Sequence, residues 1–257
     1  MKEITTRPNG VTARTLEMFD LIASKRGGVT VSEICEKLGI TKSTAYSMLR
    51  TCLESEHIAR DPATGNFILG YKFYEYAGKY QSSYAIYGNT DEKCIMMDLE
   101  YKTSYVMYVV QHDKAVVLYS MGVDDQDELS FIATPLWASA PGRVFMSDLP
   151  EDSVDEILAK ERKPLTESTI TDEKTLREII ARTKKQGYCV DHGEAAGNGL
   201  ICIAAPVRNH LGKITVVISY MMREEKWRRI GEEFTEKLLK LSADFSRDMG
   251  YKVGLFR

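Results

Sequence analysis

The sequence has few cysteines and no long apolar segment. Its five cysteines are scattered over 257 residues and form no C-x-x-C pair, which argues against a disulfide framework and against a zinc-finger cage. No stretch approaches the roughly 18 uncharged apolar residues that a membrane helix needs, and the first residues lack the apolar core of a signal peptide. We therefore expect a reducing, cytoplasmic location, no membrane partner, and no metal or other cofactor.

An excess of basic charge is also missing. The chain has 34 Lys and Arg residues against 37 Asp and Glu residues, a net charge of −3, so composition alone does not indicate a nucleic-acid binder. Hydrophobic residues make up 44% and charged residues 28%, as in ordinary globular proteins. Any contact with DNA must therefore come from a local patch.

The N-terminal part carries three helix signals. Apolar residues three and four apart predict a helix at Ala13–Ala23, with one apolar face formed by Leu16, Phe19, Ile22 and Ala23. Thr30, followed three residues later by Glu33, has the pattern of a capping box that begins a second helix. Thr41 can cap a third helix directly after a glycine break.

A hairpin and a tyrosine-rich segment follow these helices. Two short apolar runs flank the turn-rich segment 61–66, which predicts a β-hairpin. Three helices and a hairpin are the order of a winged helix-turn-helix, which we assign to residues 1–70. Residues 71–88 are predicted to form a linker helix that breaks near Gln81, with tyrosines that pack at a dimer or interdomain surface.

The third predicted helix is the candidate DNA-reading element, because a protruding helix fits a major groove and can read base edges there. Its exposed first turn has no acidic residue, and unpaired N–H groups at a helix start can meet a phosphate. The candidate DNA contacts on this helix and on the hairpin are Thr41, Lys42, Ser43, Thr44, Tyr46, Ser47, Arg50, Arg60 and Thr64. The alternative is a small helical subdomain with a solvated polar face, since acidic residues on the second helix and beyond the third nearly balance the basic ones.

From about residue 90 the pattern alternates between strands and helices. Predicted strands are Ser104–Gln111, Ala115–Ser120, Leu200–Val207 and Lys213–Tyr220, and predicted helices are Asp91–Tyr101, Pro150–Lys160, Thr171–Gln186 and Glu224–Met249. Strands joined by tight turns imply an antiparallel sheet with helices packed against it. The predicted fold class is therefore α+β, with residues 89–257 as the second domain.

Several strings of residues resemble the IclR family of bacterial regulators. Ala13–Ala23, Gly39–Ala45 and Arg60–Gly70 resemble its N-terminal signature, and Gly187–Asp191 and Gly199–Val207 resemble its C-terminal one. The resemblance implies a GAF-like effector domain, a homodimer or tetramer, and binding to a double-stranded DNA operator that a small-molecule effector modulates. It implies a regulator and not an enzyme.

Two positions depart from the family pattern. Ser47 stands where the family often has arginine in the recognition helix, so that base contact cannot be transferred. The segment Trp137–Arg143 replaces a run that often begins with histidine and borders the effector pocket. We therefore expect an organic acid, or an aldehyde or hydroxy derivative, that differs from the smallest keto acids. Arg143 could pair with a ligand carboxylate or lie solvated at the edge of the loop.

The effector site implied by the resemblance combines apolar walls with a hydroxyl, a carboxylate and a thiol. Its candidate residues are Trp137, Ala140, Pro141, Asp191, Leu200, Cys202, Ser219 and Met221. Structural alternatives remain for several of them. Cys202 lies in an apolar strand, where a thiol is usually a small core residue; Asp191 could cap a loop, and Ser219 could simply fill a strand.

Two other classes of function remain open. Cys189, His192 and Cys202 could form a thiol-enzyme site or a metal cluster, but a nucleophilic cysteine needs a positioned base. Their spacing also matches no strong metal template. The second alternative is a ligand-sensing module whose winged helix binds a protein partner, which salt-dependent DNA affinity would exclude.

Overall fold

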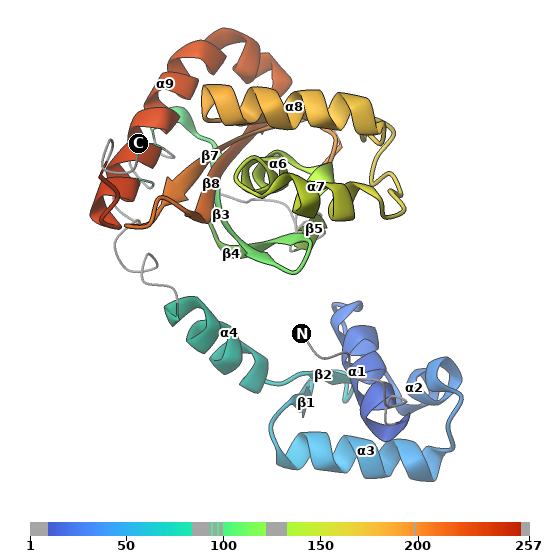
Figure 1. Cartoon of the computed structure of the whole chain (residues 1–257). Helices are drawn as coiled ribbons and strands as arrows, with labels where there is room; N and C mark the ends of the chain where they lie inside the picture. Colours follow the sequence, from blue (N-terminus) through green and yellow to red (C-terminus); the bar gives the residue numbers. More distant parts are fainter. Residues whose placement is uncertain are drawn as a thin grey trace. The chain divides into compact units, whose positions relative to one another are not determined.

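The computed structural model describes residues 10–83, 94, 97, 100–121, 133–197 and 199–252. They belong to two compact units, Met1–Tyr84 and Ala85–Arg257 (Figure 1). Each unit has a hydrophobic core of its own. Within the described residues, no helix is long and apolar enough to cross a membrane.

The first unit contains three helices, a hairpin and a further helix. In chain order they are α1 (Gly10–Ala23), α2 (Val31–Leu38), α3 (Lys42–Glu54), β1 (Ile58–Arg60), β2 (Phe67–Leu69) and α4 (Lys72–Ser82). Thr30 and Glu33 form the predicted capping box at the start of α2, and Thr41 caps α3. β1 and β2 pair antiparallel. The predicted winged helix-turn-helix is thus confirmed.

The buried face of α1 differs from the predicted one. Met18 and Ile22 are buried, while Leu16 is 58% exposed and Ala23 is also exposed. Positions 18 and 22 are four residues apart and share a face, whereas a residue two positions earlier projects to the opposite side of a helix. The predicted face was therefore right for Ile22, which is buried, and wrong for Leu16 and Ala23.

The second unit is a six-stranded antiparallel sheet with helices. Its strands are β3 (Ser104–Gln111), β4 (Lys114–Met121), β5 (Ala133–Pro135), β6 (Cys189–His192), β7 (Leu200–Arg208) and β8 (Ile214–Arg223), in the order β5-β4-β3-β8-β7-β6. Its helices are η2 (Leu136–Ala138), α6 (Ala140–Met146), α7 (Glu151–Leu158), α8 (Glu173–Gln186) and α9 (Glu224–Asp248). The predicted helix Asp91–Tyr101 and the end of the predicted linker helix lie largely outside the described residues.

Helices pack on both faces of this sheet. Helices α6, α7 and α8 share a core with Cys202 and Met221 (Figure 1). On the other face, Phe234 of α9 packs edge-on against Tyr220 of β8, with ring centroids 5.2 Å apart. Because successive strand residues point to opposite faces, Tyr220 and Met221 mark the two sides. The predicted α+β class and antiparallel sheet are confirmed.

Candidate functional site

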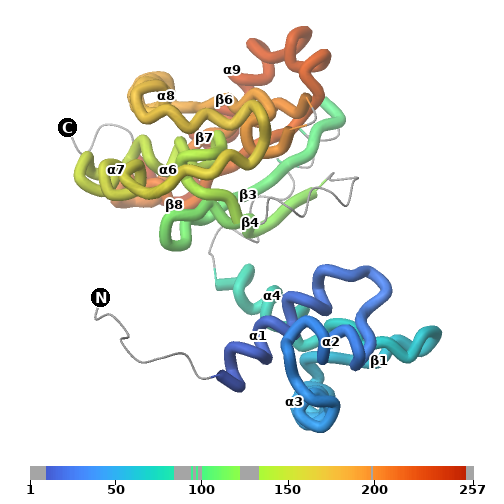
Figure 2. The backbone as a smooth tube through the Cα atoms, turned by 90° about the vertical axis from the view of Figure 1, so that its right-hand side faces the viewer, coloured from blue at the N-terminus to red at the C-terminus, as the bar shows by residue number. Residues whose placement is uncertain are grey.

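Helix α3 lies at an outer edge of the first unit in both Figure 1 and Figure 2. Its inner face is formed by the buried residues Ala45, Met48, Leu49 and Cys52. The opposite face exposes Lys42, Ser43, Thr44, Tyr46, Ser47 and Arg50. The structure thus brings the predicted contact residues of this helix onto one solvent-facing surface.

The first turn of α3 is organised by its N-cap. The Thr41 hydroxyl accepts a hydrogen bond from the Thr44 backbone N–H at 3.3 Å and lies 3.0 Å from the Thr44 hydroxyl. The two hydroxyls therefore help to begin the helix. Lys42 and Ser43 are exposed beside them, and the turn carries no acidic residue. A phosphate can approach this turn without meeting a like charge.

Arg50 has an acidic neighbour on its own helix. Its Nε donates to Glu54 Oε1 at 2.8 Å, and the two side chains are 82% and 65% exposed. The acidic residues are predicted on the second helix and beyond the third, but Glu54 is the last residue of α3. The hydrogen bond that Arg50 donates to this carboxylate raises the pKa of Arg50. An exposed pair of this kind is weak and can be exchanged for another partner.

The tip of the wing is held by its own side chains. Asp61 Oδ1 accepts hydrogen bonds from the N–H groups of Ala63 and Thr64 and from the Thr64 hydroxyl. Arg60 donates to the Gly65 carbonyl at 3.1 Å, and its guanidinium lies 4.5 Å from the centre of the Phe67 ring. Both predicted contact residues, Arg60 and Thr64, are exposed and also stabilise the turn.

In the second unit, three candidate residues form a row across the sheet. Asp191 of β6 is paired with Cys202 of β7, which is paired with Met221 of β8. Leu200 and Ser219 lie two positions from members of this row and so point to the same face. The five predicted residues from these strands therefore share one surface of the sheet.

The remaining candidates come from the segment that covers this surface. Trp137 belongs to η2, and Ala140 and Pro141 begin α6; all three are buried. The Asp191 carboxylate accepts a backbone hydrogen bond from Ala140 and another from the Glu194 N–H at 2.6 Å. Asp191 therefore caps the following loop, as one of its alternatives predicted, while it also joins the sheet to α6.

The cluster formed by these eight candidate residues is closed. Trp137 is 6% exposed, Asp191 2% and Ser219 0%. A hollow of about 460 Å³ lies between α8 and β6. Glu194 is one of the residues that line it, but none of the eight candidate residues does. Side chains thus fill the space over the sheet, and a ligand would have to displace some of them.

Arg143 is fully buried, so the interpretation that it is solvated at a loop edge was wrong. Helix α6 carries it inward, where its Nε donates to the Trp137 carbonyl at 3.0 Å and its Nη2 forms an ion pair with Glu194. Its Nη1 has no hydrogen-bond partner among the described residues. Glu194 was not among the predicted site residues. The sequence offers one signal for such a partner, because an arginine in an apolar segment needs a buried counter-ion.

Burial dominates the electrostatics of this cluster. It raises the pKa of Asp191 to about 6, and the negative charge of Glu194 adds to that shift. Burial also raises the thiol pKa of Cys202 and of Cys189. Thiols held in the neutral form are poor nucleophiles, which argues against the thiol-enzyme interpretation. The described residues contain no group of three or more His, Cys, Asp or Glu that could hold a metal ion.

Comparisons with known proteins agree with this architecture. The model of the IclR helix-turn-helix domain matches residues 11–62, and that of the bacterial transcriptional regulator IclR C-terminal domain matches residues 93–247. The Escherichia coli K12 regulator XynR is 25% identical over 93% of this chain and 96% of its own, and KdgR of the same organism is 24% identical over 97% of each.

Solved structures share the fold. The Thermotoga maritima IclR structure superposes with a TM-score of 0.75 at 24% identity, covering 93% of this chain and 98% of its own. An IclR homolog from Microbacterium hydrocarbonoxydans, complexed with 4-hydroxybenzoate, gives a TM-score of 0.75 at 19% identity over 94% of this chain and 98% of its own. With its DNA-binding helix-turn-helix domain and its C-terminal effector domain, the chain belongs to the IclR family of bacterial transcriptional regulators.

Proposed function

We propose that this regulator binds a double-stranded operator through α3 and the wing. The observation that carries the proposal is the exposed first turn of α3, which has no acidic residue and lies at an outer edge of its unit. Thr41–Thr44 would contact phosphates or bases there, together with Tyr46, Ser47 and Arg50, while Arg60 and Thr64 of the wing would reach the backbone or the adjacent minor groove.

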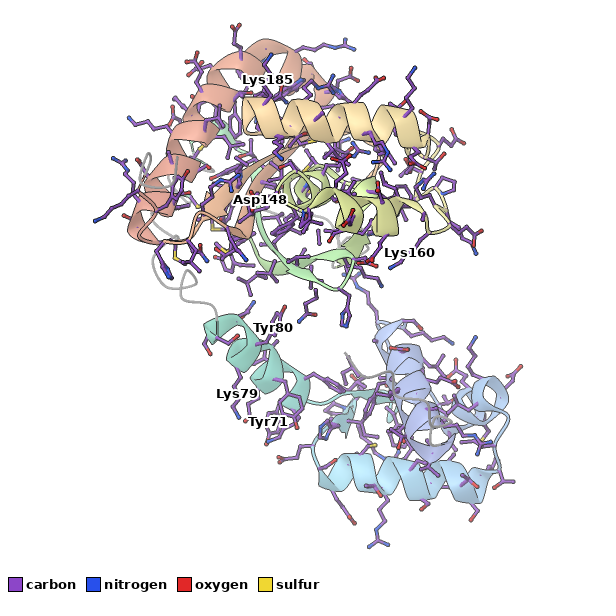
Figure 3. All side chains as sticks on the ribbon, viewed as in Figure 1. Tyr71, Lys79, Tyr80, Asp148, Lys160 and Lys185 are labelled. Carbon is purple, nitrogen blue, oxygen red and sulfur yellow. The ribbon has the colours of Figure 1, made fainter. Side chains whose placement is uncertain are left out.

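The regulator would act as a homodimer or a tetramer. A single winged helix covers one half-site, so a specific operator requires two copies related by symmetry. Helix α4 offers a surface for association, because it exposes 59% of Tyr71, 85% of Tyr74 and 46% of Tyr76. Figure 3 shows Tyr71, Lys79 and Tyr80 along this helix. Tyrosine suits such half-wet surfaces.

A small organic acid, or a related aldehyde or hydroxy compound, would control operator binding from the sheet of the second unit. The eight candidate residues would line the site when it opens. The buried Nη1 of Arg143 has no hydrogen-bond partner among the described residues. This supports an acid as the effector, because a carboxylate there would accept a hydrogen bond from that N–H group. A ligand that binds one state of the effector domain more tightly shifts the protein toward that state.

The first experiment is selection of bound duplexes from a random library by the full chain. We expect a palindromic consensus whose affinity falls as salt rises, because phosphate contacts release counterions. The selected operator then allows organic acids to be screened by their effect on binding. If no sequence is enriched, with or without a pool of organic acids, operator binding is wrong and the protein-binding alternative takes its place.

A further inference from the structure

His57 lies where four elements of the first unit meet. It follows the last turn of α3 and precedes β1, and its ring lies 6.1 Å from that of Phe19 in α1. From α4, the rings of Phe73 and Tyr76 are each 5.6 Å away. Phe19 and Phe73 are themselves packed edge-on at 5.0 Å. One histidine thus contacts both the winged helix and the helix that leaves it.

Both ring nitrogens of His57 are hydrogen-bonded. Nδ1 lies 2.9 Å from the hydroxyl of Ser55, the C-cap residue that follows α3, and Nε2 lies 3.2 Å from the hydroxyl of Tyr76. Backbone hydrogen bonds of His57 connect the same segments. The His57 N–H donates to the Cys52 carbonyl at 2.9 Å, and the Gly70 N–H donates to the His57 carbonyl at 2.8 Å. His57 therefore joins the end of α3 to the start of α4.

The neighbouring contacts leave little room for this junction to bend. The Tyr71 hydroxyl is hydrogen-bonded to the Glu56 carboxylate, and the Lys72 N–H donates to the Glu56 carbonyl at 3.4 Å. At Gly70 a side chain cannot be accommodated, since an added Cβ would lie 2.1 Å from the Glu56 carbonyl oxygen. The backbone at Gly70 thus packs directly against the backbone of Glu56.

We propose that His57 is a positioning residue for operator recognition, which fixes the direction of α4 relative to the recognition helix α3. The inference rests on the proposed function. Because α4 follows the winged helix in the chain and leads to the second unit, its direction sets where each α3 lies in a dimer. A fixed direction makes the dimer selective for one half-site spacing, since one base pair changes both the distance and the rotation between half-sites.

The experiment uses the full chain and duplexes whose half-sites are separated by the selected spacing or by one or two base pairs more or less. His57→Ala removes the ring and both of its hydrogen bonds, and Tyr76→Phe removes only the hydroxyl that meets Nε2. Ser82→Ala is the control, because it also removes one hydroxyl from α4, at an exposed side chain that donates to the Lys79 carbonyl of its own helix. Hydrogen exchange of the α4 amides is measured on each variant.

We expect the wild type and Ser82→Ala to prefer the selected spacing by about tenfold, the equivalent of ~1.4 kcal/mol. In His57→Ala this preference should fall to about twofold, with a smaller loss in Tyr76→Phe and faster exchange in α4, while affinity for a single half-site stays the same. An unchanged spacing profile in both variants would overturn the proposal, as would an equal loss at every spacing and on the half-site. If the wild type selects no operator, the proposed function fails, and unchanged exchange in α4 would show separately that His57 does not hold this helix.

Discussion

The two units place arginine–glutamate pairs in opposite environments. On α3, Arg50 and Glu54 are 82% and 65% exposed, whereas Arg143 and Glu194 of the second unit are 0% and 8% exposed. An exposed pair contributes little to stability, and its arginine can turn to a phosphate. A buried pair cannot be separated without leaving a charge in an apolar interior. The same pair of residue types is therefore accessible to a partner in one unit and fixed in the interior of the other.

The contrast extends to the candidate sites as a whole. The predicted DNA contacts of α3 are exposed in the structure as it stands, so a partner can reach them directly. Most of the effector candidates are buried, and only Leu200 has intermediate exposure. A ligand that bound among these candidates would therefore have to rearrange them, and coupling of such a change to the DNA-binding unit is what allosteric control requires.

The largest effect is expected from breaking the buried pair. Arg143→Ala leaves the Glu194 carboxylate buried without its counter-ion and should lower the free energy of unfolding of the second unit by about 3–5 kcal/mol. Urea unfolding of the full chain, followed by a probe in that unit, measures the loss. Arg177→Ala is the control, since Arg177 pairs with Glu173 and Asp155 at the surface. Equal losses in the two variants would show that burial of Arg143 has no special importance.

The features that the sequence predicted well depend on local signals. The capping box of Thr30 and Glu33 follows from residues three apart, and the strand Ser104–Gln111 was predicted with the bounds that the structure has. The short strand β6 and helix α6 were not predicted, because four and seven residues show no clear periodicity. Local patterns thus identified the long elements and missed the short ones that carry Asp191, Ala140 and Pro141.

Contacts between distant segments were beyond the sequence. The partner of Arg143 lies 51 residues away, and nothing in the periodicity of either segment relates them. His57 was not singled out, because its neighbours Phe19 and Tyr76 come from helices before and after it. The grouping of the effector candidates came from the family resemblance, and the strand register now gives its physical basis. Their role in binding stays a prediction.

The exposed pair provides the next test of the comparison. Arg50→Ala should weaken operator binding by about tenfold, as for loss of a base contact, with the stability and the effector affinity unchanged. Fluorescence anisotropy with the selected operator measures the affinity. Glu54→Gln is the complementary variant, because it keeps the size of the side chain while releasing Arg50 from its acidic partner, and it should bind DNA at least as tightly as the wild type. Wild-type affinity in Arg50→Ala would show that the exposed arginine is not used for recognition.

The smallest effect concerns the protonation of Asp191. Its pKa is about 6 in the folded chain and about 3.9 when unfolded, so the folded state binds the proton more tightly. The resulting stabilisation is complete below about pH 4 and is lost as the pH rises through about 6. From about pH 5 to pH 7, the wild type should therefore lose about 1 kcal/mol of unfolding free energy relative to Asp191→Asn. Asp172→Asn is the control, because hydrogen bonds from Thr175 lower the pKa of Asp172, and its difference from the wild type should stay constant over this range. Parallel stability curves for the wild type and Asp191→Asn would mean that Asp191 stays ionised throughout and that its hydrogen bonds from Glu194 and Ala140 compensate its buried charge.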